Sequence, residues 1–450
     1  GFTETAAMIL RLGTEEQKRR WVPRIVSGEV KGAVAMTEPQ AGSDVGNVQT
    51  TAREEGGCWR LTGRKQFISA GNGELVIVLA RCVPGSTGLE GLGLFLVERA
   101  RDGQDNYIVE RAEHKFTIRG SSTCSLVFEG SKAELLGEVG GGWRGILTFM
   151  NESRIAIGLQ GLGIGEAAHE KAARYAAERV QMGRPIREHP MVAEMLLDME
   201  TTIAGLRALA TEASTLQDLV THGKDERAAR RLREITPLVK WYGSEEIIRV
   251  CRNALQIFGG YGVVTEYEIE RHMRDALILP IYEGTSQIQS LMAVRDLMRV
   301  ILRSPASLVR GGPTPTLARA KFDGDIGRNF ADARSTLVGA LRGLVAGMAR
   351  RGGLELVRGK RQPSEDEMRP FLLHAERITE TLAHLHVARA LAEQVAWVPE
   401  RRGLAERAAR RAKLVAKRNA VAMGSGDGGV FERIDAWTKE RGASGRGAAR

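Results

Sequence analysis

The stretch RDALILPIYEGTSQIQ, which begins at Arg274, presents a single carboxylate in a setting that suits proton transfer. Six uncharged residues, Leu277 to Tyr282, lead directly into Glu283, and a Gly-Thr-Ser turn follows it. Desolvation in a dry pocket raises the pKa of a carboxyl group toward the range in which a general base works. The same letters also fit a helix N-terminus, with Pro280 at its start and an acidic residue favoured by the helix dipole.

Two earlier segments offer groups that could face a polar ligand. In AMTEPQAGSD (35–44), Pro and Gly bend the chain so that backbone N–H groups and the hydroxyls of Thr37 and Ser43 can point at a ligand, although an Asx-type turn capped by Asp44 is an alternative. In QFIS (66–69), strand alternation places Phe67 and Ser69 on one side, unless Phe67 is a core residue.

Two later segments carry glycines and cations. In LQIFGGYG (255–262), Gly259 and Gly260 let the backbone approach a phosphate or adenosine, whereas GGxG alone is more often a helix C-cap. FMNESRIAIG (149–158) contains Asn151 and Arg154, a cation that suits an anionic ligand or, alternatively, a surface ion pair.

The elements that must position these residues change type along the chain. Residues 1–30 read as helix, and the opening GFTETAAMIL reads as the middle of one, so a chain shortened at its N-terminus is expected. Residues 31–133 alternate in short apolar runs with turns, which predicts an antiparallel β-barrel-like middle domain. Helical spacing over 134–302 predicts a four-helix bundle.

A further module follows the bundle. Pro and Gly between 303 and 322 indicate a linker, and 323–450 is expected to be an extra all-α module with a basic tail. Apolar residues at helical spacing support two of its helices: Leu337, Leu341, Leu344 and Met348, then Ile378, Leu382 and Leu385. His384 and His386 are two apart, so a helix would place them on different faces. The predicted class is therefore α+β, and the element order excludes a repeating βαβ fold.

Charge and cysteine use narrow the function classes. Residues 303–450 contain 28 basic and 16 acidic residues, whereas the rest contains 37 and 39, so the basic character belongs to the C-terminal third. This permits a polyanionic partner or a membrane surface, though arginine-rich helices are more often a solvated face. Four widely spaced cysteines offer no paired metal spacing, so no metal site is predicted, and a reduced, cytoplasmic setting is expected.

These segments, with GRKQFISAG (63–71), IRGSSTC (118–124) and ERVQMGRPI (178–186), occur in an order and spacing that resemble the acyl-CoA dehydrogenase family from residue 1 to about 302. The helices after about 318 resemble the C-terminal extensions of long bacterial members, and the family resemblance implies that residues 1–30 are the remnant of an N-terminal helical domain. The chain departs from the usual pattern at Phe67 and Ser69, where Trp and Thr are usual, and at Met182, where Phe is commoner.

The resemblance implies an FAD site and an acyl-CoA site. Glu283 would be the catalytic base, and Glu152, one residue out of register with the base of other branches, would not. His189 matches a position near FAD. FAD contacts are implied for Met36, Thr37, Ser43, Phe67, Ile68, Ser69, Arg179, Gln181, Gln256, Gly259, Gly260, Thr285 and Gln287. Substrate contacts are implied for Ser43, Asn151, Arg154, Gly284 and Arg295.

The function implied is α,β-dehydrogenation of an acyl-CoA thioester to the trans-2-enoyl-CoA, in fatty acid β-oxidation and lipid metabolism. Glu283 takes the α-proton, a backbone N–H and a ribityl hydroxyl stabilise the enolate, and the β-hydrogen leaves as hydride to flavin N5. An electron-transferring flavoprotein is the implied acceptor, and a homodimer or homotetramer follows if two subunits build each FAD site. The alternatives are an acyl-CoA oxidase and an alkylation-response-type flavoprotein that binds DNA.

Overall fold

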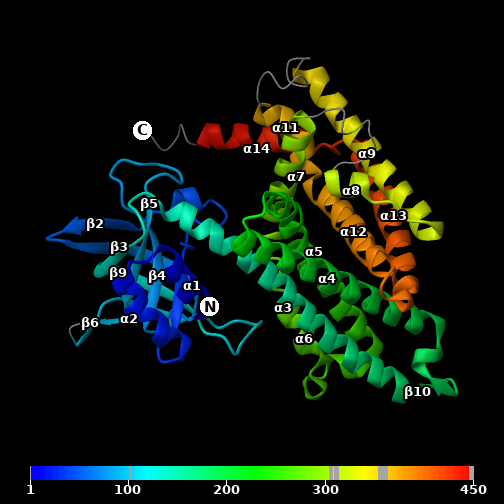
Figure 1. Cartoon of the computed structure of the whole chain (residues 1–450), viewed down its shortest axis with the longest axis horizontal. Coiled ribbons are helices and arrows are strands. Elements are labelled where there is room, and N and C mark those ends of the chain that lie inside the picture. Colours follow the sequence, from blue (N-terminus) through cyan, green and yellow to red (C-terminus); the bar gives the residue numbers. More distant parts are fainter. Residues whose placement is uncertain (1, 102, 304–307, 309–313, 353–362, 445–450) are drawn as a thin grey trace. The chain divides into compact units, whose positions relative to one another are not determined.

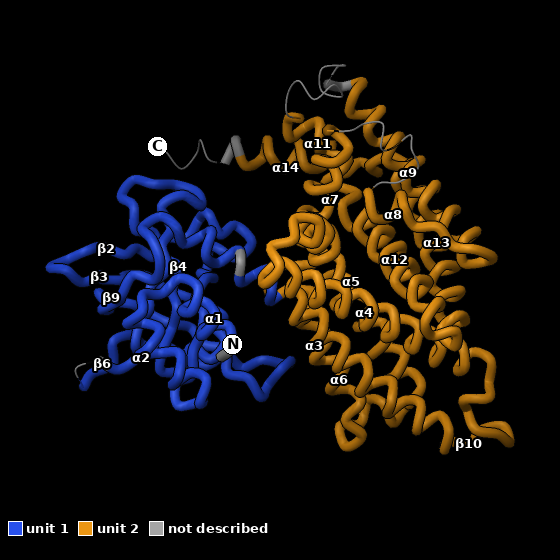
Figure 2. The backbone as a smooth tube through the Cα atoms, in the orientation of Figure 1, with its two compact units in different colours: residues 1–153 blue, residues 154–450 orange. Residues whose placement is uncertain are grey.

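The computed structural model describes residues 2–101, 103–303, 308, 314–352 and 363–444. The chain divides into two compact units, residues 1–153 (unit 1) and residues 154–450 (unit 2), as Figure 2 shows. Unit 1 contains the large sheet, and unit 2 is almost entirely helical (Figure 1). This agrees with the predicted α+β class.

Unit 1 begins with two helices, α1 (Phe2–Leu12) and α2 (Glu15–Val26). Thr14 caps α2 because its hydroxyl accepts from Gln17 N and the Gln17 side chain accepts from Thr14 N, which completes a capping box. Trp21 and Ile25 of α2 are buried. The predicted helical character of residues 1–30 is therefore confirmed.

The main sheet of unit 1 has seven strands. Their pairings run β4–β2–β3–β9–β5 and return from β5 to β4, with β1 beside β4 and β8 beside β9. A short helix, η1 (Val45–Asn47), precedes β2, and a two-stranded ribbon joins β5 to β8. The strands are β1 (Gly32–Ala35), β2 (Thr51–Glu55), β3 (Cys58–Ser69), β4 (Leu75–Arg81), β5 (Leu92–Glu98), β6 (Ala100–Arg101), β7 (Gln104–Asp105), β8 (Ile108–Ala112) and β9 (Thr123–Leu136).

The prediction of a purely antiparallel middle domain is wrong in one respect. β1 pairs with β4 in parallel over four residues, and β2 meets β4 in parallel at Thr51 and Arg81. Parallel neighbours need a long connection, and β1 and β4 are separated by two other strands along the chain. Apolar alternation reports which face a residue occupies but not the direction of the neighbouring strand.

Strand β4 is buried on both faces. Leu75, Ile77 and Leu79 lie in one apolar cluster with Ile9 and Trp21 of the two helices. Val76, Val78 and Ala80 lie in another with residues of β3, β5 and β9. Side chains two apart in a strand share a face, so β4 separates the two clusters and fixes α1 and α2 on the sheet.

Unit 2 is built on long helices. Helix α3 begins in unit 1 and continues into unit 2, and α4 and α5 pack along each other. Short elements join them: β10 (Val180–Gln181), β11 (Arg184–Pro185), η2 (Ile186–Glu188), η3 (Gly259–Val263), η4 (Thr265–Tyr267) and η6 (Pro399–Arg401). The helices are α3 (Gly142–Glu178), α4 (Pro190–Gly223), α5 (Glu226–Phe258), α6 (Ile269–Ala276), α7 (Ser286–Arg303), α8 (Pro315–Arg319), α9 (Gly324–Gly352), α11 (Glu365–Leu373), α12 (Ala375–Gln394), α13 (Arg402–Gly424) and α14 (Val430–Ser444).

Helix α12 lies at the centre of the added helices. It contacts α4, α5 and α7 on one side and α9 and α13 on the other. The predicted stripe of Ile378, Leu382 and Leu385 is buried, and so are most of the remaining residues of the helix, His384 and His386 among them. The three predicted apolar residues are therefore only part of the buried surface of α12, because neighbouring helices cover this helix on all sides.

Residues 304–307 and 309–313 of the predicted linker, 303–322, lie outside the described residues. Its described part includes α8, where Thr314 caps the first turn and Leu317 is buried. At the other end, α14 runs to Ser444, and the predicted basic tail beyond it lies outside the described residues. Over the described chain, no helix combines the length and apolar character that a membrane span requires.

Candidate functional site

The turn that carries Glu283 has an unusual backbone. Helix α6 ends at Ala276, α7 begins at Ser286, and between them Glu283 has φ 55° and Gly284 has φ 83°. A non-glycine residue in the left-handed region is sterically costly and clusters at functional sites. Thr285 then caps α7, because Ile288 N donates to its Oγ1 at 3.2 Å. The helix therefore begins at Ser286, after Glu283, so the interpretation of a helix N-terminus with Pro280 at its start is wrong.

Helix α7 itself holds this turn. The buried side chain of Gln289 donates from Nε2 to the carbonyl oxygens of Glu283 at 3.3 Å and Gly284 at 3.2 Å. Ser286 N donates to Pro280 O at 2.9 Å. A Cβ at Gly284 would lie 2.7 Å from Gln289 Nε2. Gly284 is therefore required both by its φ and by the close approach of Gln289.

Helices α3 and α5 hold the residues before the turn. Tyr282 donates its hydroxyl hydrogen bond to Gln160 of α3. The carbonyl of Leu279 accepts from Lys240 Nζ at 2.7 Å and lies 3.0 Å from Ser244 Oγ, both on α5. Three helices of unit 2 thus converge on the segment that presents Glu283.

Charged groups from the same helices act on Glu283. Arg154 of α3 is buried; burial lowers the pKa of its guanidinium group, and the charge of Glu283 opposes that shift. The interpretation of Arg154 as a surface ion pair is therefore wrong. Its place as a substrate contact stays a prediction.

The apolar run before Glu283 does not form a continuous dry wall. Leu279 is fully buried, whereas Ile281 is 59% exposed and Glu283 is half-buried. The run winds through turns, so successive side chains point in different directions. The expectation that the whole run shields the carboxylate is wrong for Ile281 in the isolated chain.

In unit 1, the two segments predicted to face the flavin lie side by side. Gln66 N donates to Thr37 O at 2.9 Å, and Lys65 Nζ donates to Met36 O at 2.9 Å. Lys65 also forms a fully buried ion pair with Glu38 at 2.7 Å. Burial lowers the pKa of Lys65 to about 8 although Glu38 opposes the shift. This ion pair holds residues 37–40 (the TEPQ segment) against β3.

Phe67 is not a core residue, since its ring is 60% exposed. Its φ is 62°, and the register of β3 against β9 shifts between Lys65 and Ile68, so the strand is irregular where Phe67 projects. Ser69 is exposed as well, whereas Ile68 is buried in the sheet core. Ile68 could therefore meet a cofactor only through its backbone. Ser43 is exposed, and Asp44 precedes η1 without a side-chain capping bond, so the Asx-type alternative is not supported.

In unit 2, Arg179 and the GGYG turn are neighbours. The guanidinium carbon of Arg179 lies 5.8 Å from the ring centre of Tyr261, and Tyr175 stacks on Phe258 at 4.3 Å. A Cβ at Gly259 or Gly260 would meet no atom within 4 Å. Gln181 of β10 and Gln256 of α5 are exposed, and His189 interacts with Arg184 and with the carbonyl of Gln181.

Three further predicted residues lie at positions that do not by themselves indicate a ligand contact. Gln287 donates to Glu376 of α12 at 2.8 Å, so its amide is already engaged within unit 2. Asn151 and Arg295 are exposed on α3 and α7. Their predicted roles stay predictions.

Glu152, the rejected alternative base, lies in unit 1. Its carboxylate accepts from Arg11 at 2.5 Å, and both residues line a cavity of about 440 Å³ together with Glu4 and Arg144. The ion pair commits Glu152 to a cation on α1. The assignment of the base to Glu283 rather than Glu152 stays a prediction.

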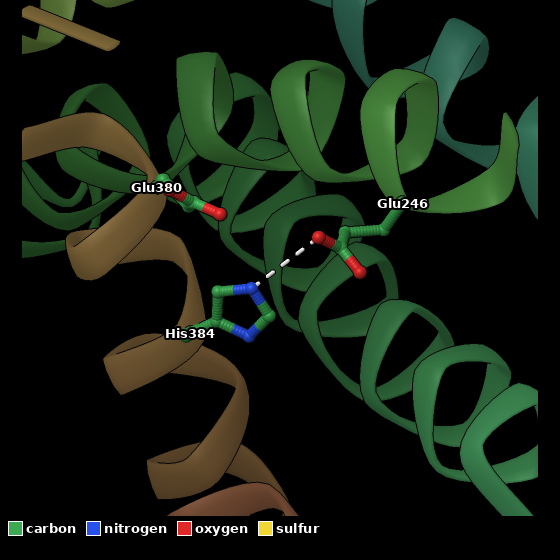
Figure 3. Close-up of side chains that lie close together, drawn as sticks. All are labelled: Glu246, Glu380 and His384. Carbon is green, nitrogen blue, oxygen red and sulfur yellow. Dashed lines mark ion pairs between the residues drawn. The ribbon is translucent and has the colours of Figure 1, made fainter. Parts of the chain in front are cut away.

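One cluster resembles a metal site but has another explanation. Glu246 of α5 and Glu380 and His384 of α12 place ligand atoms within 4.8 Å of one another (Figure 3). Arg249 and Arg411 already bind Glu246, while Arg418 and Asn419 bind Glu380. Three guanidinium groups oppose a divalent cation, so this cluster is an ion-pair network that joins α12 and α13 to α4 and α5.

Sequence reasoning missed the residues that position the candidate site. Lys240 and Gln289 hold the turn, and Glu38 and Lys65 fix the TEPQ segment. Lys240 did leave a signal, because it is a lone cation in the stretch ITPLVKWYG of α5. A lone charge inside an apolar helical segment indicates a buried partner.

Unit 2 thus contains a strained carboxylate turn. Unit 1, described by itself, contains exposed aromatic and hydroxyl groups beside a glycine-bent segment. Residues 33–131 match the middle domain of acyl-CoA dehydrogenases, and residues 140–298 match the acyl-CoA dehydrogenase C-terminal domain.

Comparisons with individual proteins indicate the same family. An acyl-CoA dehydrogenase of Bacillus subtilis (strain 168) is 37% identical over 295 residues, which cover 64% of this chain and 74% of that protein. Caffeyl-CoA reductase-Etf complex subunit CarC of Acetobacterium woodii is 34% identical over 288 residues, covering 63% and 73%. The acyl-CoA dehydrogenase of Bacillus anthracis complexed with FAD has a TM-score of 0.77 at 23% identity, covers 97% of this chain and 76% of that chain, and so shares its fold.

The chain belongs to the acyl-CoA dehydrogenase family and is an oxidoreductase of that family. The family and the enzyme class predicted from the motifs are confirmed. The fold shared with the Bacillus anthracis protein also extends beyond residue 302, so the added helices belong to a known architecture.

Proposed function

We propose that this protein is an FAD-dependent dehydrogenase of acyl-CoA thioesters in which Glu283 accepts the α-proton. The observation that carries the proposal is the Glu283 turn. The φ of 55° and the hydrogen bond from Gln289 constrain the backbone of Glu283, while Arg154 and Lys240 interact electrostatically with its carboxylate. A strained and over-determined acidic residue is a functional-site candidate.

The residues present suit a flavin. In unit 1, the exposed Phe67 ring offers an aromatic face, and the neighbouring TEPQ segment offers hydroxyl and backbone groups. In unit 2, Arg179 and the uncrowded Gly259 and Gly260 suit an anionic nucleotide. When bound, FAD supplies the two-electron acceptor for the β-hydrogen that leaves as hydride.

The chain's own residues supply positioning and proton transfer. Gln289 and Thr285 fix the backbone that follows Glu283, so the turn needs little reorganisation to present its carboxylate to a substrate carbon. Glu283 must be ionised when substrate arrives and becomes neutral as it takes the α-proton. The enolate that forms needs a hydrogen-bond donor at the thioester oxygen, and we assign that donor to the backbone N–H of Glu283.

We extend the proposal to partners and setting. An electron-transferring flavoprotein is the proposed acceptor, supported by the Acetobacterium woodii relative, which is named as a subunit of a reductase-Etf complex. That name also indicates that the same half-reaction can run toward reduction of an enoyl-CoA. Fatty acid β-oxidation, a homo-oligomeric state and a cytoplasmic location remain part of the proposal.

Anaerobic titration of the yellow flavoprotein with acyl-CoAs of increasing length tests the proposal. Substrate should bleach the flavin absorbance, and the Glu283→Gln variant should keep the flavin while bleaching about 10²- to 10⁴-fold more slowly. Glu152→Gln is the matched control and should bleach like wild type. Normal bleaching by Glu283→Gln together with loss in Glu152→Gln would assign the base to Glu152.

Two added arms decide between neighbouring functions. Rapid reoxidation in air identifies an oxidase, whereas dependence on an electron-transferring flavoprotein identifies a dehydrogenase. Reoxidation of the dithionite-reduced flavin by an enoyl-CoA, in preference to acyl-CoA bleaching at matched concentration, identifies a reductase.

A further inference from the structure

A buried ammonium group lies behind the Glu283 turn. Lys240, in the middle of α5, is 0% exposed, and within the described chain Leu279 O at 2.7 Å is the acceptor of its one hydrogen bond. Lysine is almost never fully buried without a partner of opposite charge, because removing an ammonium group from water is costly. A single carbonyl is weak compensation for that cost, so the charge must interact with something else.

The hydrogen bond alone does not require a cation. Ser244, one turn further along α5, has its Oγ 3.0 Å from the same carbonyl oxygen. The one hydrogen of this neutral hydroxyl can be donated to Leu279 O or to Lys240 O, which lies 2.8 Å away. What Lys240 adds to this place is its positive charge.

The charged groups around Lys240 come from three elements. Burial lowers the pKa of Lys240 to about 8, while Glu245 of α5 and Glu283 of the turn oppose the shift and Arg154 of α3 adds to it. Electrostatic coupling is mutual, so the cation that Glu283 stabilises also stabilises the Glu283 carboxylate. Arg154 is coupled to Glu283 in the same way.

A base in a site that closes around substrate faces a conflict. Desolvation favours the protonated carboxyl, but only the ionised form can accept the α-proton. We propose that Lys240 is a positioning residue for Glu283: its hydrogen bond fixes the Leu279 end of the turn, and its positive charge keeps Glu283 ionised. This inference rests on the proposed function, because it needs Glu283 to act as a base.

The proposal predicts a particular pH profile. Removing a neighbouring cation raises the pKa of a carboxyl group, so the acid limb of kcat/KM should move to higher pH in Lys240→Gln and Lys240→Met, by about one pH unit. At a pH well below the acid limb of both proteins this corresponds to about tenfold lower kcat/KM. Above pH 8, wild-type Lys240 itself loses its charge, and the profiles of wild type and Lys240→Gln should converge.

The test uses the full chain with FAD and one acyl-CoA substrate. Ser244→Ala is the matched control, because it removes a donor from the same carbonyl without changing charge. It should lower thermal stability while leaving the acid limb where it is. An unmoved acid limb in Lys240→Gln, with only reduced stability, would show that Lys240 is merely structural and would overturn the proposal.

A second measurement leaves Lys240 intact in case its variants do not fold. In protein labelled with ¹³Cε-lysine, Glu283→Gln should lower the pH at which one lysine that titrates near 8 changes its shift. Lys65 also has a pKa of about 8, but its partner is Glu38, so the pH at which the Lys65 signal changes should be the same as in wild type. If every lysine titrates as in wild type, the coupling is absent and the proposal fails. If Glu283→Gln still bleaches normally, it is the assignment of the base that fails.

Discussion

At the residue scale, the site depends on backbone conformation as much as on side-chain type. Glu283 occupies a φ that glycine tolerates and glutamate does not favour, and Gln289 stabilises it by binding the carbonyls of Glu283 and Gly284. The backbone that carries the side chain is thereby held in one conformation before any ligand binds. This explains why a Gly must follow the base.

We predict that Gly284→Ala destabilises the protein by about 1–2 kcal/mol, because a Cβ both disfavours φ 83° and collides with Gln289. Its kcat should fall as well, since the displaced turn carries the base. Thermal unfolding and steady-state kinetics measure the two effects. Gly339→Ala is the control, because a Cβ there meets open space in α9, and it should stabilise by up to about 1 kcal/mol. Equal effects of both substitutions would contradict the role given to Gly284.

At the element scale, buried ion pairs fasten segments that have few apolar residues of their own. The TEPQ segment is fixed to β3 by Glu38, which accepts from Lys65 and from the backbone N–H groups of Gln49 and Thr50. Burial opposes ionisation of Glu38, but Lys65 outweighs it, so the pKa of Glu38 lies below its usual value. The predicted cofactor residues Thr37 and Phe67 flank this pair.

We predict that Lys65→Met destabilises the chain by about 3–5 kcal/mol, because it leaves the Glu38 carboxylate buried without its cation. Urea denaturation measures the change. The double variant Lys65→Met with Glu38→Gln should recover part of the loss, and a double-mutant cycle gives the coupling between the two. A loss below 1 kcal/mol in the single variant would show that water already screens the pair.

Helix α12 is fastened in the same manner. His384 Nε2 lies 3.4 Å from Glu246 Oε1, and His386 Nε2 lies 3.1 Å from Glu234 Oε1. Arg389 pairs with Glu212. Three carboxylates of α4 and α5 thus contact side chains of α12. Burial opposes ionisation of both carboxyl groups. At Glu234 the interactions with His386 and the hydroxyls of Thr314 and Thr316 outweigh burial, and at Glu246 those with His384, Arg411 and Arg418 do, so both pKa values lie below 4.5.

A carboxyl group with a lowered pKa in the folded state stabilises it above the unfolded value, and that contribution disappears as pH falls through the folded value. We therefore predict that the free energy of unfolding declines as pH drops below 4.5. Urea denaturation between pH 7 and pH 3.5 measures this. Glu234→Gln should be less stable than wild type at pH 7 and show a shallower decline. A decline of wild-type steepness in both Glu234→Gln and Glu246→Gln would assign the acid sensitivity elsewhere.

At the scale of the whole molecule, part of the basic charge of the C-terminal third is internal. Arg407 pairs with Glu194, Arg411 with Asp198 and Glu246, and Arg389 with Glu212. These arginines bind carboxylates of α4 and α5 rather than facing a polyanion. The DNA-binding alternative thereby loses several of the cations that motivated it.

Unit 2 also exposes apolar side chains around the predicted nucleotide-binding residues. Met182 is 93% exposed, Val263 71% and Val180 53%. Exposed apolar residues that gather in one region indicate an interface. We predict that Met182→Asp weakens the proposed homo-oligomer and lowers flavin content together, as analytical ultracentrifugation and the flavin-to-protein absorbance ratio would show. The exposed Leu219→Asp on α4 is the control. A variant that is fully assembled and fully loaded would place the interface elsewhere.

The sequence by itself determined the family, the helix–sheet–helix order and the choice of Glu283, because motifs and apolar periodicity are local properties of the chain. Only the tertiary structure decided what acts on that carboxylate. Lys240 and Arg154 are far from Glu283 in sequence, and Gln289 is close to it but has no distinguishing pattern. The packing of α3, α5 and α7 brings these side chains to the Glu283 turn. The parallel pairing of β1 with β4 and the complete burial of α12 were hidden for the same reason. The pattern of residue types indicates which side of a helix or strand is apolar. Burial, strand direction and charge pairing depend on the neighbouring elements, which that pattern does not identify.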